Sequence, residues 1–399
     1  MKASEFDASP SALGYIYQVR YALFAALEKI RELDDPDNHS IVIEKIDDIS
    51  FHNEGTPKEL LQTKHRAKNT NLTDKSPDIW KTIRIWSELI LSGEIDLYSN
   101  TFYLITTQES PDNSLASYLS YNNQRRDTSK AMERVNTICS QKVGKEISKG
   151  VNAFNSLSVA QKTGLLSRIE VVTKSKDITE IGVQLRNSLK LNIGKEHLTA
   201  YVERLEGYWF NKAIECMRGD ITSIPLREVI YFFDDLRNQF LPTNLPNDYS
   251  DIDIDELGFE DEDKIFLQQI KLFTESKNIL SIAKENYYRT YAQVLRWQSD
   301  GLLQPNEMTK YRNKLSKEWR NINSLSEMEH DTSWEKGKVL HAKSIYRHCQ
   351  IGSIIPIRLH FDEPYVCRGT YHYLADNLHI GWHPEYLSLL KSSNDEEVA

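Results

Sequence analysis

Residues 41–64, IVIEKIDDISFHNEGTPKELLQTK, decide the fold because they predict three short strands in succession. The residues Asn53-Glu54-Gly55-Thr56-Pro57 predict a hairpin turn between the second and third strands. That hairpin would bring Asp48, at the start of the second strand, beside Gln62 and Lys64 near the end of the third. The stretch therefore predicts a carboxylate, an amide and an ammonium group at one place on a sheet.

These three groups suggest hydrolysis of nucleic acid, because together they can hold a divalent metal ion and a water molecule next to a phosphodiester. The structural alternative makes Asp47 and Asp48 turn residues and Lys64 a strand-end lysine that reaches solvent. A strand buried on both faces is otherwise apolar, so Gln62 needs a polar partner. The basic segment His65-Arg66-Ala67-Lys68 follows, where a phosphate backbone would lie. These two details favour a site.

The flanking sequence predicts an α/β domain. Apolar residues at helical spacing predict a helix over residues 11–33, and Ser76-Pro77-Asp78 begins another that extends to about residue 92. Residues 101–106, TFYLIT, predict a buried strand. Helix, three strands, helix and strand is the order of the restriction-endonuclease-like core, so we expect an α/β N-terminal domain of that class.

The rest of the chain is expected to be mainly helical. Before the acidic run we predict helices near 114–121, 129–148, 178–191, 196–217 and 226–240, with a strand at 169–173. After that run we predict helices near 266–275, 278–297, 306–323 and 333–349, then a mixed segment at 354–390. The predicted division is a nuclease-like domain with a helical extension (1–240), an acidic linker (241–263) and a helical C-terminal partner-binding domain (264–399).

Composition narrows the class of protein. The 399 residues carry a net charge of −9, which argues against a protein that coats nucleic acid with its whole surface. Basic residues are instead concentrated at 63–84 and 124–149, and acidic residues at 248–263. The four cysteines are widely spaced, no apolar run could span a bilayer, and the first residues contain no apolar signal segment. We therefore expect a reduced cytoplasmic protein without a membrane partner.

Two groups of motifs resemble anti-phage effectors. GYxYQxxxAL (from Gly14), IEKIDDISF, LLQTKH and NLTDKSPDIWKTIRIW resemble the PD-(D/E)xK-type endonuclease domain found in CD-NTase-associated endonucleases. The segment RGTYHYLADNLHIGWHPEY (368–386) resembles the C-terminal domain of the effector subunit of Lamassu, or ABC-three-component, systems. The two resemblances lie at opposite ends of the chain, and the middle contributes little.

The resemblance implies a role for each matched residue. Asp48 would be the principal metal carboxylate, with Gln62 where most such nucleases have a second acid, and Lys64 would act at the scissile phosphate. Glu44 and Asp47 are further candidates for metal binding or catalysis, and the register of the strand leaves Asp47 and Asp48 unranked. The implied metal set is Asp48, Glu44 and Gln62, and the implied cofactor is Mg²⁺ or Mn²⁺. A neutral amide is a weaker ligand than a carboxylate, so Gln62 puts the metal affinity in doubt. Gln18 would either reach the site or form a structural hydrogen bond.

Basic residues predict a DNA partner. Arg66 and Lys68 in the basic segment, and Lys81 and Arg84 on one helix face, would contact the phosphates of double-stranded DNA, and a solvated helix face is the alternative for Lys81 and Arg84. The resemblance implies further partners. An SMC-like ATPase and a small accessory subunit would hold the nuclease silent until foreign DNA is sensed, and release would allow self-association. The competing interpretation is a non-catalytic DNA-binding or scaffold subunit that keeps the fold without the chemistry.

Two other patterns are weaker, and two nucleotide-binding motifs are absent. Asp251, Asp253, Asp255 and Glu262 have EF-hand spacing, but Glu256 stands where the loop needs glycine, so a solvated acidic linker is favoured. Seven of the eleven histidines follow residue 329 without the close spacing of a zinc site, which favours structural histidines. The sequence contains no phosphate-binding P-loop and no dinucleotide-binding glycine motif, so an ATP-driven function would need a partner.

Overall fold

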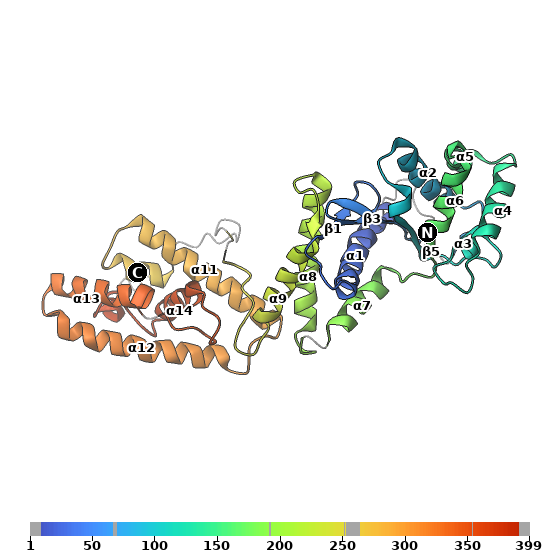
Figure 1. Ribbon diagram of the computed structural model, residues 1–399. Coiled ribbons are helices and arrows are strands. Elements are labelled where there is room, and N and C mark those ends of the chain that lie inside the picture. The colour runs from blue at the N-terminus through green and yellow to red at the C-terminus, as the bar shows by residue number, and fades with distance from the viewer. Residues whose placement is uncertain are drawn as a thin grey trace. The chain divides into compact units, whose positions relative to one another are not determined.

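The computed structural model describes residues 9–66, 70–190, 193–250, 252, 264–352 and 354–390. The chain divides into two compact units (Figure 1). Met1–Asn192 and Tyr201–Asp234 form the N-terminal unit, and Ile193–Ala200 and Asp235–Ala399 form the C-terminal unit. The first unit contains the sheet and the second is helical, which confirms the two coarse fold classes expected from the sequence.

The N-terminal unit is built on one mixed sheet whose strands lie in the order β5-β4-β3-β2-β1-β6. β2 is antiparallel to β1 and to β3, β1 is antiparallel to β6, and the β3, β4 and β5 strands are parallel. The strand bounds are β1 His39–Ile43, β2 Ile49–Asn53, β3 Thr56–Lys64, β4 Thr101–Thr106, β5 Ile169–Val172 and β6 Ile224–Pro225. The predicted strands are present, and the short edge strand β6 was not predicted.

The predicted hairpin joins β2 to β3 through Glu54 and Gly55. Both residues have positive φ, 50° and 75°, as required at the centre of a tight hairpin turn that follows the twist of its strands. Glycine adopts this conformation without a Cβ penalty, which explains Gly55. The turn fixes the register, with Ile49 opposite Leu61 and Ser50 opposite Leu60.

Helices cover both faces of this sheet. Leu60 of β3 belongs to an apolar core with Trp80 and Trp86 of α2 (Pro77–Ser92) and Phe154 of α5 (Lys145–Ser156). The neighbouring Glu59, which alternation places on the other face, forms an ion pair with Lys29 of α1 (Ser9–Glu32). The other helices are α3 Leu115–Tyr118, α4 Thr128–Cys139, α6 Val159–Arg168, α7 Ile178–Leu189, α8 Leu198–Arg218 and α9 Leu226–Gln239.

The single helix predicted over residues 129–148 is wrong. α4 ends at Cys139, and α5 begins at Lys145 after the break that ends in Gly144. α5 does not continue α4, because it packs closely on α2. A Cβ at Gly150 would overlap the backbone oxygen of Trp80. α6 was not predicted, although Ser158 and Gln161 form a capping box at its start. The helix predicted at 114–121 is reduced to the four-residue α3.

The C-terminal unit is a helical assembly with an aromatic core. Its helices are α10 Ile265–Lys271, α11 Lys277–Ser299, α12 Glu307–Glu329, α13 Glu335–Arg347 and α14 Pro364–Asp376. Phe266, Trp297, Tyr371 and Trp382 are fully buried in its core. The end of α12, at Glu329, lies beyond the predicted end at residue 323.

Part of the expected linker is packed onto this unit. Leu245 is 2% exposed in the aromatic core, and the indole nitrogen of Trp297 donates a hydrogen bond to the carbonyl oxygen of Pro246 over 2.7 Å. Most of the acidic run, residues 251 and 253–263, lies outside the described residues, and so does the EF-hand-like spacing.

The described helices include none that is both long enough and apolar enough to cross a bilayer. No disulfide links the four cysteines, all of which lie in the described part of the chain.

We predict that Gly150→Ala destabilises the N-terminal unit by about 1–3 kcal/mol, because the added methyl group forces α5 away from α2. Urea unfolding followed by tryptophan fluorescence measures the loss. Gly207→Ala is the matched control, since a Cβ at that α8 position meets nothing within 4 Å and alanine is the better helix former. Equal stability of the two variants would contradict the packing argument.

Candidate active site

A cavity of about 450 Å³ lies at the end of β3 and is also lined by the N-terminal halves of α1 and α2. It contains most of the residues that the sequence identified as a candidate site. The cavity is lined by Gly14, Tyr15, Gln18, Glu44, Asp48, Gln62, Thr63, Lys64, His65, Arg66, Asp78, Lys81 and Ile85. Segments far apart in the sequence therefore meet at one end of the sheet.

The hairpin register brings Asp48 beside Gln62, as the sequence predicted. Ile49 pairs with Leu61, so the residue before β2 lies next to the residue after Leu61 on β3. The side-chain amide of Gln62 donates a hydrogen bond to the carboxylate of Asp48. Gln62 is 2% exposed, and this bond supplies the polar partner that a buried amide requires.

The Asp48 carboxylate accepts several hydrogen bonds from β3. The backbone N–H of Thr63 donates to Oδ2 over 2.8 Å, and the Thr63 hydroxyl donates to the same oxygen over 3.0 Å. The other oxygen accepts from Gln62. The Asp48 side chain is only 18% exposed, so these bonds compensate the lost hydration of a charged group.

Lys64 completes the network from the last position of β3. Its Nζ donates to the Gln62 side-chain oxygen over 2.8 Å and to the Thr63 carbonyl oxygen over 3.1 Å, and it lies 3.8 Å from the Asp48 carboxylate. Burial lowers the pKa of Lys64, and the nearby Asp48 carboxylate opposes that effect. An ammonium group is thus held beside a carboxylate, with one side on the cavity.

Glu44 and Gln18 complete the wall near Asp48. Glu44 has a positive φ of 58°, and its N–H donates to the carbonyl oxygen of Asp48 over 3.0 Å, which closes the turn before β2. Partial burial raises the pKa of Glu44, while a hydrogen bond with the side chain of Gln18 acts in the opposite direction. The Gln18 amide also donates to the Asp48 carbonyl oxygen over 2.8 Å. Gln18 therefore forms the expected helix-to-strand bond and also lines the cavity.

Asp47 and Asp48 have opposite environments. Asp47 is 6% exposed and is not among the residues that line the cavity. Its Oδ2 accepts a hydrogen bond from the indole nitrogen of Trp86 over 2.6 Å, and its Oδ1 accepts from the N–H of Asp48 over 2.9 Å. Burial raises the pKa of Asp47 to about 7. The tertiary structure thus places the two residues differently: Asp48 lines the cavity, and Asp47 is buried against α2.

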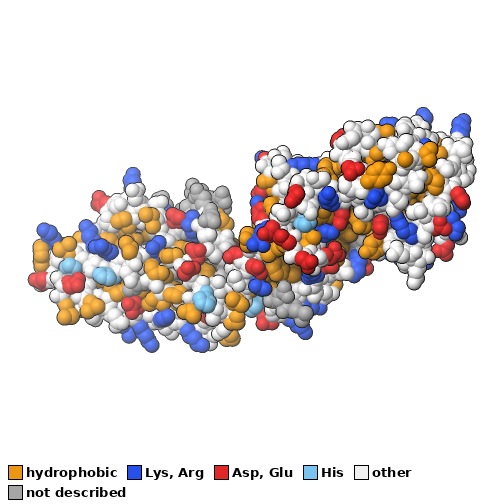
Figure 2. Space-filling model, viewed as in Figure 1, with side chains coloured by type: hydrophobic (Ala, Val, Ile, Leu, Met, Phe, Trp, Pro, Cys, Tyr) orange, Lys and Arg blue, Asp and Glu red, His pale blue; other side chains and the backbone are white. Residues whose placement is uncertain are grey.

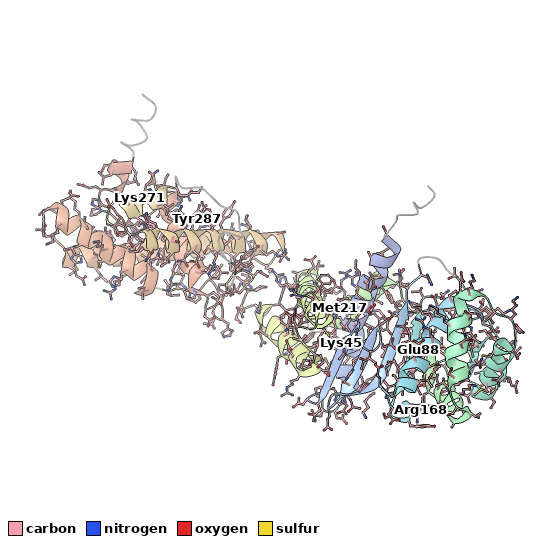
Figure 3. The ribbon with its side chains drawn as sticks, turned by 90° about the horizontal axis from the view of Figure 1, so that it is seen from above. Lys45, Glu88, Arg168, Met217, Lys271 and Tyr287 are labelled. Carbon is pink, nitrogen blue, oxygen red and sulfur yellow. The ribbon has the colours of Figure 1, made fainter. Side chains whose placement is uncertain are left out.

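Of the four residues expected to contact DNA, two line the cavity. Arg66 makes two hydrogen bonds to the carboxylate of Asp78, at the start of α2, and Lys81 is exposed on the same helix. Arg84 does not line the cavity, and its Nε lies 3.7 Å from Oε1 of Glu88. Figure 3 labels Glu88. Lys68 lies outside the described residues.

The basic character of the site is local. Lys45, also labelled in Figure 3, does not line the cavity and donates to the carbonyl oxygens of Ile221 and Thr222. On the face shown in Figure 2, acidic and basic side chains are interspersed over both units. The net negative charge is therefore compatible with a cavity whose rim contains the cations Lys64, Arg66 and Lys81.

Sequence reasoning did not assign a site role to Gly14, Tyr15 or Asp78, all of which line the cavity. Gly14 and Tyr15 belong to the motif GYxYQ, and their place in that motif could have indicated that they lie at the site. Asp78 was identified as part of the α2 start, but its pairing with Arg66 depends on how α2 packs against the end of β3. No periodicity in the sequence reports that contact.

Comparison with known families identifies the C-terminal unit. Residues 266–390 match the model of C-terminal domain 7 of the ABC-three component (ABC-3C) systems. All the matched residues lie in the C-terminal unit. The match supports the resemblance drawn from residues 368–386 and associates the C-terminal unit with ABC-three-component systems.

Solved structures show weaker similarity. The Acinetobacter baumannii Cap4 SAVED/CARF-domain containing receptor with the cyclic trinucleotide 3'3'3'-cAAA is 16% identical over 70% of this chain and 60% of that chain, with a TM-score of 0.33. The same receptor with 2'3'3'-cAAA is 13% identical over 70% and 66% of the two chains, with the same TM-score. The chain thus spans less than two thirds of the receptor, and a TM-score of 0.33 does not establish a common fold. No curated protein matches the sequence.

The burial of Asp47 predicts a pH-dependent stability. A folded pKa of about 7 lies above the ordinary value of about 3.9, so the folded state binds the proton more tightly than the unfolded state. The contribution of Asp47 to stability is therefore greatest below about pH 4 and is lost as the pH rises towards 7. As the pH rises from 5 to 8, we expect the free energy of unfolding of Asp47→Asn to fall less than that of the wild type. Urea unfolding at each pH measures this difference.

The quantity compared is the slope of the free energy of unfolding against pH. The absolute free energies are not compared, because the asparagine also alters the hydrogen bonds of Asp47 at every pH. Asp112→Asn, at an aspartate whose side chain is 84% exposed, is the control and keeps the wild-type slope. An Asp47→Asn slope equal to that of the wild type would show that this carboxyl is ionised normally.

Proposed function

We propose that the chain is a metal-dependent DNA endonuclease and the effector of an ABC-three-component defence complex. The observation that carries this proposal is the convergence of Asp48, Gln62 and Lys64 in one cavity with a cationic rim. The order α1-β1-β2-β3-α2-β4 supports a restriction-endonuclease-like core, because the site lies where a hairpin strand ends beside a parallel neighbour. The family match supports the defence setting.

The donor set fits a hard divalent cation. Asp48 and Glu44 offer carboxylate oxygens and Gln62 offers an amide oxygen, the ligand types that Mg²⁺ and Mn²⁺ prefer. Among the described residues, no group of three His, Cys, Asp or Glu side chains could hold a metal ion, so the amide is an essential part of this set. A bound cation would activate a water molecule and offset charge at the phosphate.

The Gln62 amide has an orientation that a cation would reverse. Its nitrogen now faces the Asp48 carboxylate, and its oxygen faces the Lys64 ammonium. Rotation of the amide plane by half a turn would direct its oxygen towards Asp48, an arrangement that is favourable only with a cation between the two oxygens. The rotation would also release the Lys64 ammonium from that oxygen.

Lys64 is the group best placed to act on the phosphodiester. Once released from Gln62, its ammonium would donate a hydrogen bond to a non-bridging phosphate oxygen and stabilise the charge that develops in the transition state. Arg66 and Lys81 would hold the neighbouring phosphates and fix the strand in the cavity. Arg66 is already oriented by Asp78, which restricts its side chain before DNA arrives.

The C-terminal unit would connect the nuclease to its partners in the cytoplasm. An ABC-three-component system implies further components, and we propose that these are an SMC-like ATPase and a small accessory subunit. Docking through residues 264–399 would keep the nuclease silent until foreign DNA is sensed. Release would then permit self-association, because cleavage of both strands needs two active sites or two visits.

One observation favours a second candidate, a DNA-binding or scaffold subunit without catalysis. Asp48, Gln62 and Lys64 satisfy one another by hydrogen bonds, so the cluster is stable without a metal ion. A neutral Gln62 in place of an acid is what a degenerate nuclease site would contain. The two candidates differ in what removal of Lys64 does.

We predict that Lys64→Ala abolishes metal-dependent plasmid cleavage while the chain remains folded. Cleavage by wild type is measured with Mg²⁺, with Mn²⁺ and with EDTA, first on the purified chain and then on the complete three-component complex during activation of defence. Lys58→Ala removes the same charge from an exposed position of β3 and should cleave like the wild type. If the complete activated complex does not cleave the plasmid, the nuclease proposal is rejected and the scaffold candidate is favoured.

We further predict that Gln62→Glu increases metal-dependent stabilisation. Without metal, a second buried carboxylate against Asp48 loses a hydrogen bond and adds like-charge repulsion, so we expect a loss of about 1–3 kcal/mol in EDTA. A bound cation removes the repulsion, and Mn²⁺ should therefore raise the melting temperature of the variant more than that of wild type. If Mn²⁺ does not change the melting temperature of the variant, the metal ion binds elsewhere or the chain binds none.

A further inference from the structure

The α1 side of the catalytic cavity contains an aromatic ring with no partner in the described structure. Tyr15 lines the cavity and is 58% exposed. Within the described residues it makes no hydrogen bond, ring contact or ion pair. Tyr17, two residues later, is fully buried, lies 4.8 Å from the ring of His65 between centroids, and bonds to Ser175. The chain therefore uses Tyr17 for packing and leaves Tyr15 open at the rim.

Gly14 is beside it, and no contact within the described residues explains a glycine there. A Cβ at this position would meet no described atom within 4 Å, so close packing in that part of the chain does not require its absence. Glycine inside a helix lowers helix stability relative to alanine, and Gly14 lies in the second turn of α1. Because Gly14 also lines the cavity, its missing side chain leaves space for a ligand to approach the helix backbone.

The parts of the cavity wall formed by α2 and the end of β3 provide the cations Lys64, Arg66 and Lys81. An aromatic surface combined with a cationic groove is how proteins hold single-stranded nucleic acid, since bases stack on the ring while the cations follow the backbone. A base inside a continuous duplex has both faces covered by its neighbours, so a tyrosine can stack only on an unpaired or extruded base. The tyrosine ring and the cations together therefore favour a nucleotide whose base is unpaired.

The geometry points to a nucleotide subsite in which the Tyr15 ring stacks on an unpaired nucleobase next to the scissile phosphate, with Gly14 leaving room for its sugar. This inference rests on the proposed nuclease function and names its substrate class: DNA with an unpaired nucleotide, such as a single-stranded tail or a distorted duplex. Tyr15 is on this account a substrate-positioning residue, and the chemistry remains with Asp48 and Lys64.

A protein-docking surface is the competing explanation for exposed apolar side chains on α1. Leu13 and Ile16 are 40% and 46% exposed, and Ile16 lines a different groove together with Phe210 of α8. That groove does not include Tyr15. Substitutions at Tyr15 and at Ile16 therefore separate a nucleotide subsite from a docking surface.

The first test measures DNA affinity by fluorescence anisotropy, using the full chain in EDTA so that metal-dependent cleavage is prevented and the DNA stays intact. The probes are a labelled duplex with a single-stranded tail and the same duplex with blunt ends. Tyr15→Ala should weaken binding of the tailed probe by about tenfold or more, with a smaller effect on the blunt probe. Tyr15→Phe keeps the ring and should bind normally, and so should Ile16→Ala.

The second test uses a variant that is expected to gain stability. Gly14→Ala and Gly207→Ala both place alanine in a helix where a Cβ meets nothing within 4 Å, so both should raise the melting temperature slightly. Only Gly14→Ala should weaken binding of the tailed probe. A loss of affinity together with a gain in stability cannot arise from misfolding.

The outcomes separate this inference from the proposed function. If the chain binds both probes and Tyr15→Ala changes neither affinity, the subsite is rejected and the nuclease proposal stands. If Ile16→Ala weakens binding as much as Tyr15→Ala, the exposed part of α1 is a docking surface and the subsite is rejected. If the chain binds neither probe, the subsite and its DNA substrate are rejected together.

Discussion

The Asp48 carboxylate and the end of β3 form the interaction on which the site depends. A carboxylate that is 18% exposed must recover its lost hydration through hydrogen bonds, and two donors come from Thr63 and one from Gln62. One of these donors is a backbone N–H, which cannot move away without distortion of the strand. The same bonds that stabilise the charge therefore hold the turn before β2 against β3 and place Lys64 beside it.

The adjacent aspartates show how the sheet separates two chemically equal side chains. Asp47 is turned towards the indole of Trp86 in a dry environment that raises its pKa to about 7, whereas Asp48 faces the cavity and accepts bonds from β3. The two neighbouring carboxyl groups therefore differ in hydration and in hydrogen-bond partners. Here the division follows from the position of α2, which supplies Trp86.

The chemistry and the family match lie in different units. The cavity belongs to the N-terminal unit, and the residues that match the ABC-three-component domain belong to the C-terminal unit. In the proposed effector, a partner would bind the unit that does not contain the cavity. It also means that the family match by itself does not define the reaction, so the proposed nuclease rests on the geometry of the cavity.

The sequence by itself determined the local elements and one pair of neighbours. Alternating side chains and a turn with Gly55 specify the β2–β3 hairpin, and a hairpin is a short-range structure, so Asp48 beside Gln62 could be read from residue spacing. The break between α4 and α5 could not, because it depends on how Gly150 meets Trp80 of a distant helix. Tertiary packing also decided which aspartate faces the cavity and brought Gly14, Tyr15 and Asp78 to its wall, since contacts between α1, α2 and β3 depend on the path of the whole chain.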